Sequence, residues 1–141
     1  MNKVLVAYAS KSLQVQGIAQ AVARALRSRC LLINMSDKAF DRDVGKLEDY
    51  RAVVLGTPVK FGRAHSDFVK FVKRNKKELA AKKLIIYACG GASPEKCEDR
   101  IKKKLPMPIN KASVLYFHIE EGEKVDPDAL NNLCREAERI Y

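Results

Sequence analysis

The segment KVLVAYASKSLQVQGIAQAVARAL, residues 3–26, contains the pattern that decides the fold. It opens with the nearly continuous apolar run Lys3 to Ala9, which is typical of a strand buried on both faces. The polar stretch Ser10 to Gln16 follows. Beyond it, apolar side chains recur at every fourth position among alanines: Ile18, Val22 and Leu26. This spacing predicts a helix with one core-facing stripe, so the segment encodes a strand, a loop and a helix.

The same alternation continues along the chain. Further apolar runs predict strands at Cys30–Asn34, Ala52–Leu55, Leu84–Cys89 and Ser113–Ile119. Apolar stripes predict further helices, which carry Phe68, Val72 and Leu79; Cys97, Ile101 and Leu105; and Leu130, Leu133, Cys134, Ala137 and Tyr141. The third strand is expected to stop at Pro58, because proline has no backbone donor. The polar segment Met35–Lys46 is expected to be irregular.

Strands that alternate with helices through short connections predict a doubly wound α/β domain. Connections between parallel strands are right-handed crossovers, which place helices on both faces of a parallel sheet. The length of 141 residues is that of one domain, and no repeat or low-complexity linker interrupts the pattern. We therefore expect residues 1–141 to form a single domain.

Composition narrows the class of protein. Apolar residues make up 47% and charged residues 31%, which is typical of a folded globular chain. Residues 1–10 lack the features of a secretory signal and no run approaches membrane-spanning length, so a cytoplasmic location is expected. The four cysteines lack CxxC spacing, which argues against a disulfide framework or a zinc site.

The chain is basic, with 27 Lys and Arg residues against 17 Asp and Glu and a net charge of +10. Nine of the basic residues lie between Lys60 and Lys83, mostly spaced as the solvated faces of helices. A basic face can also bind an acidic redox partner, nucleic acid or an anionic membrane surface. Nucleic acid is the less favoured partner, because aromatic side chains do not interleave the basic ones.

Three loops are candidates for a ligand site. In doubly wound sheets, ligands bind outside the carboxyl ends of the strands, which selects Ser10 to Gln16, Gly56 to His65 and Cys89 to Ser93. The first loop enters a helix N-terminus, where backbone amides and the helix dipole favour an anion. Its two serines and one lysine fit a phosphate, and they equally fit simple capping and turning of the chain.

The opening segment, together with LEDYRAVVLGTPVKFGRAHSDFVKFVKRNKKEL at residues 47–79, resembles the flavodoxin family. The resemblance is closest to the short flavodoxin-like domain branch that includes menaquinone-dependent protoporphyrinogen oxidase. It lies in a strand followed by a hydroxyl-rich loop, and in the later residues Gly56-Thr57-Pro58, Gly62-Arg63 and His65. The resemblance implies a flavodoxin-like five-stranded parallel sheet in the order 2-1-3-4-5.

The resemblance also implies that the protein binds FMN. The phosphate would lie in the first loop, and the isoalloxazine ring between the second and third loops. By position in the family, the residues that contact FMN would be Ser10, Lys11, Ser12, Gln14 and Val15 at the phosphate, Thr57, Pro58, Val59, Lys60, Phe61 and Gly62 beside the ring, and Cys89, Gly90, Gly91 and Ala92 at its other edge. No side chain would be an obligatory catalyst, because the flavin itself performs the redox chemistry.

Two functions therefore remain open. The first is an FMN-binding protein that transfers electrons or acts as a small flavin-dependent oxidoreductase. The second is a binding or scaffold module that has lost FMN and uses its basic face to bind an acidic partner or nucleic acid. Leu13, Val15 and Lys60 depart from the family pattern and favour the second function, whereas the Gly-Thr-Pro and Gly-Arg-Ala-His residues favour the first.

Two further residues carry alternatives. His65 begins a predicted helix, where histidine is more often a cap or a surface residue than a neighbour of a cofactor. Cys89 ends an apolar strand, and burial explains it more simply than a role as a reactive thiol.

Overall fold

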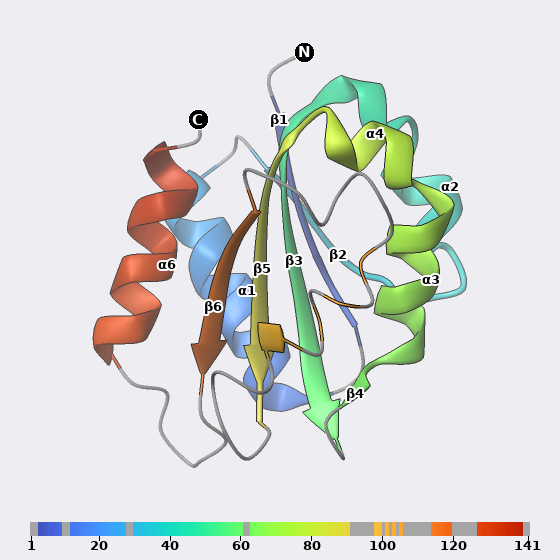
Figure 1. Ribbon diagram of the computed structural model, residues 1–141. Coiled ribbons are helices and arrows are strands. Elements are labelled where there is room, and N and C mark those ends of the chain that lie inside the picture. Colours follow the sequence, from blue (N-terminus) through green and yellow to red (C-terminus); the bar gives the residue numbers. More distant parts are fainter. Residues whose placement is uncertain are drawn as a thin grey trace.

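The computed structural model describes residues 3–9, 12–27, 30–60, 63–90, 98–99, 101, 103, 105, 114–119 and 127–139. Strands and helices alternate along the chain (Figure 1). In order they are β1 (Lys3–Tyr8), α1 (Leu13–Leu26), β2 (Cys30–Asn34), α2 (Phe40–Val44), the 3-10 helix η2 (Leu47–Asp49), β3 (Tyr50–Lys60), β4 (Arg63–Ala64), α3 (Ser66–Arg74), α4 (Lys76–Ala80), β5 (Lys83–Cys89), β6 (Val114–Ile119) and α6 (Pro127–Arg139).

The sheet has the order β2-β1-β3-β5-β6, and every neighbouring pair in this row is parallel. The short strand β4 pairs with β3 in the antiparallel direction. The predicted α/β fold is therefore confirmed. When the five long strands are counted along the chain without the short strand β4, their order in the sheet is the expected 2-1-3-4-5. The carboxyl ends of these strands all lie at one edge of the sheet.

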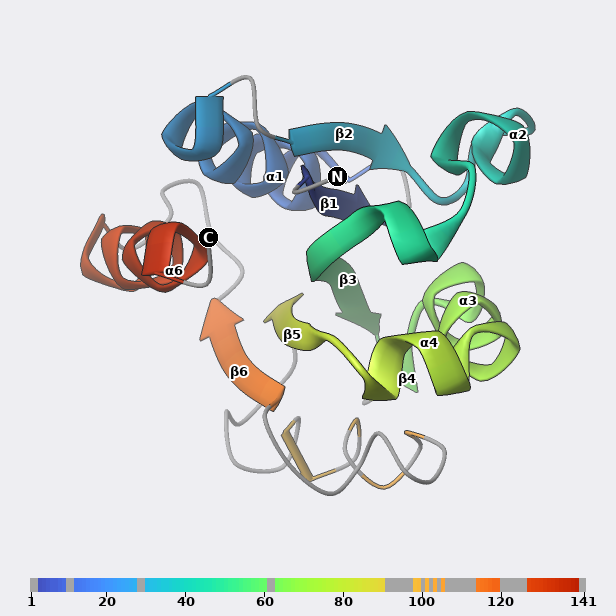
Figure 2. The ribbon, with the colours of Figure 1, turned by 90° about the horizontal axis from the view of Figure 1, so that it is seen from above.

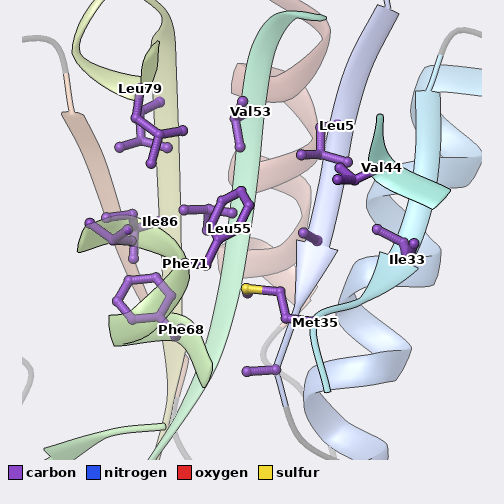
Figure 3. Close-up of a cluster of buried hydrophobic side chains, with 14 of the residues drawn as sticks. Leu5, Ile33, Met35, Val44, Val53, Leu55, Phe68, Phe71, Leu79 and Ile86 are labelled. Atoms are coloured by element: carbon purple, nitrogen blue, oxygen red, sulfur yellow. The ribbon is translucent and has the colours of Figure 1, made fainter. Parts of the chain in front are cut away.

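Helices cover both faces of the sheet (Figure 2). The helices α1 and α6 lie on one face, where a buried cluster includes Val6, Ile18 and Leu133. The helices α2, α3 and α4 lie on the other face, and side chains such as Leu55 and Phe71 fill the space beneath them (Figure 3). Successive strand residues point to opposite faces, which is why the strands are apolar at nearly every position.

The strand β3 is longer than the sequence predicts. It continues through Pro58 to Lys60, so the prediction that it stops at Pro58 is wrong. The Gly56 carbonyl accepts the Ala9 amide, so Gly56 directs its backbone groups toward β1. Backbone direction repeats every second residue, so the Pro58 nitrogen also points to this side, where β1 has ended at Tyr8. The missing donor therefore interrupts no ladder.

Two other segments differ from the predictions. The segment Met35–Lys46, expected to be irregular, contains α2, which buries Phe40 and Val44. The helix predicted after His65 is two helices, α3 and α4, separated at Asn75. Both the backbone amide and the side-chain amide of Asn75 donate to the Phe71 carbonyl, which closes the end of α3.

The predicted core stripes of the last two helices are borne out where the structure describes them. Ile101 and Leu105 are buried in the cluster on the face of the sheet that α3 covers. Leu133 and Ala137 of α6 are fully buried. The predicted stripe members Cys97 and Tyr141, and the Leu130 side chain, lie outside the described residues. Within the described part of the chain, no helix has the length and apolar character needed to cross a membrane.

Candidate functional site

A pocket of about 810 Å³ lies at the carboxyl ends of the strands. Its size is within the range of pockets that bind small molecules and cofactors. The described residues that line it are Ser12, Gln14, Ser36, Pro58, Val59, Lys60, Arg63, Ala64, His65, Asp67 and Cys89. The pocket thus joins the start of α1, the end of β3 with β4, the start of α3 and the end of β5.

The start of α1 supplies the part of the pocket that can bind an anion. Ser12 is the N-cap residue, and its hydroxyl makes no capping bond to the helix. The first turn has no acidic side chain, so nothing on the helix neutralises the positive end of its dipole. The first-turn amides have no acceptor within the helix, as at every helix start. Ser12, Gln14 and these amides therefore form a donor set suited to a phosphate.

Leu13 and Val15, the two residues of this loop that depart from the family pattern, have different environments. The Leu13 side chain is 84% exposed, and its backbone is helical without positive φ. The Val15 side chain is 0% exposed and packs in the core beneath α1. Val15 can therefore meet a ligand only through its backbone.

The packing of the core leaves no room for a side chain at position 56. Gly56 pairs directly with Tyr87 of β5, and the fully buried Tyr87 ring lies across it. A β-carbon at Gly56 would overlap Cζ and Oη of Tyr87 and lie 2.6 Å from its Cε2. The Tyr87 hydroxyl continues to α1, where it donates to the Val15 carbonyl over 2.9 Å. Burial raises the pKa of Tyr87 well above 10.0, with smaller contributions from Cys89 and Tyr8.

Thr57 connects the end of β3 to the start of α3. Its side chain is 0% exposed, so it does not point into the pocket. Its hydroxyl donates to the Pro58 carbonyl over 2.9 Å and accepts the His65 amide over 2.9 Å. Thr57 therefore positions the lining residues and is not itself among the described lining residues.

His65 caps α3, as one of its two interpretations expected. Its Nδ1 accepts the Asp67 amide over 3.1 Å. The neutral ring carries one proton, so this bond assigns the proton to Nε2 and makes Nε2–H a donor. The Asp67 carboxylate lies 3.6 Å from Nδ1 and accepts a 2.7 Å hydrogen bond from the Ser36 hydroxyl. A residue from the β2 end thus joins two from α3 on one wall of the pocket.

Cys89 and Gly90 form the end of β5. Cys89 pairs with Pro58 across the sheet, is 4% exposed and lines the pocket. Gly90 has φ +95°, a backbone conformation that other residues adopt only with strain. The burial of Cys89 agrees with the simpler of its two interpretations.

The predicted site residues divide into three groups. Those that line the pocket are Ser12, Gln14, Pro58, Val59, Lys60 and Cys89. Those that are buried and are not among the described lining residues are Val15, Thr57 and Gly90. Those that lie outside the described residues are Ser10, Lys11, Phe61, Gly62, Gly91 and Ala92. The pocket therefore contains members of all three predicted loops.

Five lining residues were not among the predicted contact residues: Ser36, Arg63, Ala64, His65 and Asp67. Arg63, Ala64 and His65 lie within the second predicted loop, whereas Ser36 and Asp67 lie outside all three loops. Ser36 follows the second strand, and the rule that selects the carboxyl ends of parallel strands also covers that loop. Asp67 lies just beyond the end of the second predicted loop, and its contact with Ser36 spans 31 positions in the chain. No group of three or more His, Cys, Asp or Glu side chains within the described ranges could hold a metal ion.

The sheet order defines a doubly wound α/β protein, and its pocket lies at the carboxyl ends of the strands, where such sheets bind ligands. The sequence profile of the flavodoxin domain family matches residues 5–125. Because this match covers most of the chain, the protein belongs to the flavodoxin domain family. No curated protein sequence matches the chain.

Solved structures share the fold at low sequence identity. Flavodoxin 2 from Bacillus cereus is 21% identical, with a TM-score of 0.65 over 98% of this chain and 97% of that one. The WrbA-like flavodoxin from Agrobacterium tumefaciens is 16% identical, with a TM-score of 0.69 over 99% and 94%. An oxidoreductase from Corynebacterium diphtheriae is 18% identical, with a TM-score of 0.65 over 98% and 94%.

Proposed function

We propose that the protein binds FMN in this pocket and functions as an electron carrier or a small flavin-dependent oxidoreductase in the cytoplasm, with residues 1–141 acting as one domain. One observation carries the proposal: a single pocket of about 810 Å³ joins the start of α1 to the ends of β3 and β5. Membership of the flavodoxin family and the similarity to flavodoxin structures support it.

The donors at the start of α1 fit the FMN phosphate. Ser12 and Gln14 would hold it together with the first-turn amides. Val59 and Lys60 would border the isoalloxazine ring from β3, and Cys89 would close its other edge from β5. When bound, the flavin supplies the redox chemistry, and the protein's residues bind and orient it.

The basic charge of the chain supports an acidic redox partner, since opposite potentials accelerate association. The narrower resemblance to the short branch that includes menaquinone-dependent protoporphyrinogen oxidase is part of this proposal. It rests on the Gly-Thr-Pro and Gly-Arg-Ala-His residues.

The proposal is tested by titrating the purified protein with FMN and with riboflavin, following the quenching of flavin fluorescence. Ser12→Asp is the informative variant. Aspartate is a good N-cap residue, so the helix should be as stable as before, while its charge should repel the phosphate. A hydrogen bond to a charged group contributes about 1.5–3 kcal/mol, so its loss should weaken FMN binding tenfold to hundredfold. Riboflavin has no phosphate, so its affinity should change little.

Two results would count against FMN binding. One is a colourless protein whose thermal stability is unchanged by excess FMN. The other is an equal effect of Ser12→Asp on FMN and riboflavin, which would place the phosphate elsewhere.

A further inference from the structure

Resting on the proposed function, we propose that the β3–β4 hairpin carries a second binding subsite, which holds the carboxylate or phosphate group of a small anionic redox substrate beside the flavin. The residues that form this subsite are Lys60, Arg63 and His65. All three line the pocket, and none of them belongs to the phosphate-binding donor set at the start of α1.

The register of the hairpin is the first argument. Lys60 and Arg63 are direct cross-strand partners in the antiparallel pair of β3 and β4. Directly opposite side chains lie on the same face of a hairpin, about 5 Å apart at their β-carbons. Like charges in this position destabilise the pair, so the arrangement has a cost in the protein without ligand. An anion bound between the two side chains would remove that repulsion.

The surrounding charges are the second argument. Both Lys60 and Arg63 are exposed, and neither forms an ion pair with another described residue. Asp67 is the acidic residue among the described lining residues. Its carboxylate accepts the Ser36 hydroxyl and lies 3.6 Å from His65 Nδ1. The two cations therefore stay available to a ligand.

His65 adds a third hydrogen-bond donor, its Nε2–H group. Because Nδ1 accepts the Asp67 amide, the neutral ring presents a proton on Nε2. The ring is partly exposed in the pocket wall, with its side chain 31% accessible. The subsite thus combines two cations with a neutral N–H donor. This set of donors suits a carboxylate or phosphate oxygen and contains no acceptor for a cationic substrate.

The position of the subsite distinguishes it from the FMN phosphate site. Lys60 and Arg63 belong to the hairpin at the end of β3, whereas the phosphate donors Ser12 and Gln14 belong to α1. A small anion bound at the hairpin would lie at the edge of the ring that Val59 and Lys60 are proposed to border. Substrate recognition and phosphate binding would then use different elements around one pocket, with Lys60 at the border between the subsite and the ring.

The test uses inorganic phosphate as the probe and follows the Arg63 Nε–H resonance by NMR in ¹⁵N-labelled protein. The titration is made with FMN bound and repeated on the apoprotein, against sodium chloride at equal ionic strength. We expect a saturable shift with half-saturation in the millimolar range for phosphate, and only a linear drift with chloride. Flavin binding is measured separately, so its failure would be distinguished from failure of the subsite.

Lys60→Glu is the decisive variant, with Lys77→Glu on α4 as a control of equal charge change. Lys60→Glu places a carboxylate opposite Arg63, so it should weaken phosphate binding at least tenfold and also raise the urea midpoint of unfolding. Lys77→Glu should change phosphate affinity less than twofold. Equal losses in both variants, a lowered midpoint for Lys60→Glu, or identical responses to phosphate and chloride would overturn the proposal.

Discussion

The contact between Gly56 and Tyr87 gives the most quantitative prediction for the fold. In Gly56→Ala the new methyl group would overlap the Tyr87 ring, lying 2.6 Å from Cε2 and closer still to Cζ and Oη. The ring cannot move aside, because it is fully buried and its hydroxyl is bonded to the Val15 carbonyl. Overpacking of this kind costs about 1–3 kcal/mol and occasionally more, and we expect a loss of about 3 kcal/mol.

The measurement is urea unfolding followed by circular dichroism. With a slope of about 2 kcal/mol per molar urea, the midpoint should fall by about 1.5 M. Gly17→Ala is the matched control, because its new methyl group would meet no atom within 4 Å. It lies inside α1, so it should stabilise the protein by about 0.5–1 kcal/mol.

A double-mutant cycle identifies the cause of the loss. Leucine lacks the overlapping ring atoms, so Gly56→Ala should cost less in a Tyr87→Leu background than in the wild type. A Gly56→Ala protein within about 0.5 kcal/mol of the wild type would refute the packing explanation. An undiminished cost in the Tyr87→Leu background would refute it as well.

Three further predictions concern single side chains. Burial raises the pKa of Tyr87 above 10.0, so stability should be full below pH 10 and fall as the pH rises beyond it; Tyr87→Phe should flatten this fall in alkaline urea titrations. His65→Ala removes the cap of α3 and should cost about 0.5–2 kcal/mol in urea, whereas His65→Asn should retain most of it. Arg74→Ala breaks an exposed ion pair with Asp41 and should change the unfolding free energy by less than about 1 kcal/mol.

The parts of the fold that the sequence predicts are those with strong local periodicity. Long apolar runs and four-residue stripes identified the five long strands and the α1 and α6 core faces. The strand β4 has two residues and α2 has five, which is too short for a periodic signal. Pro58 was misjudged because a rule for central strands was applied without knowing where β1 ends.

The site was predictable as a set of loops, and less so as a set of side chains. The strand-end rule selected the edge of the sheet at which the pocket lies. Val15 lies three positions before Ile18 and seven before Val22, so the helical period already places it on the core stripe. The contact of Ser36 with Asp67 depends on the packing of α3 against the β2 end, which no local pattern encodes.

The extension of β3 beyond β1 has a consequence for how the protein meets other chains. A strand that outruns its neighbour exposes backbone amides that can recruit a strand from a second molecule. At Pro58 the backbone has no amide hydrogen on the side that β1 leaves open. The residues beyond it, Val59 and Lys60, are already paired with β4, and Pro58 is paired with Cys89 of β5, so the overhanging end of β3 is a poor template for intermolecular pairing.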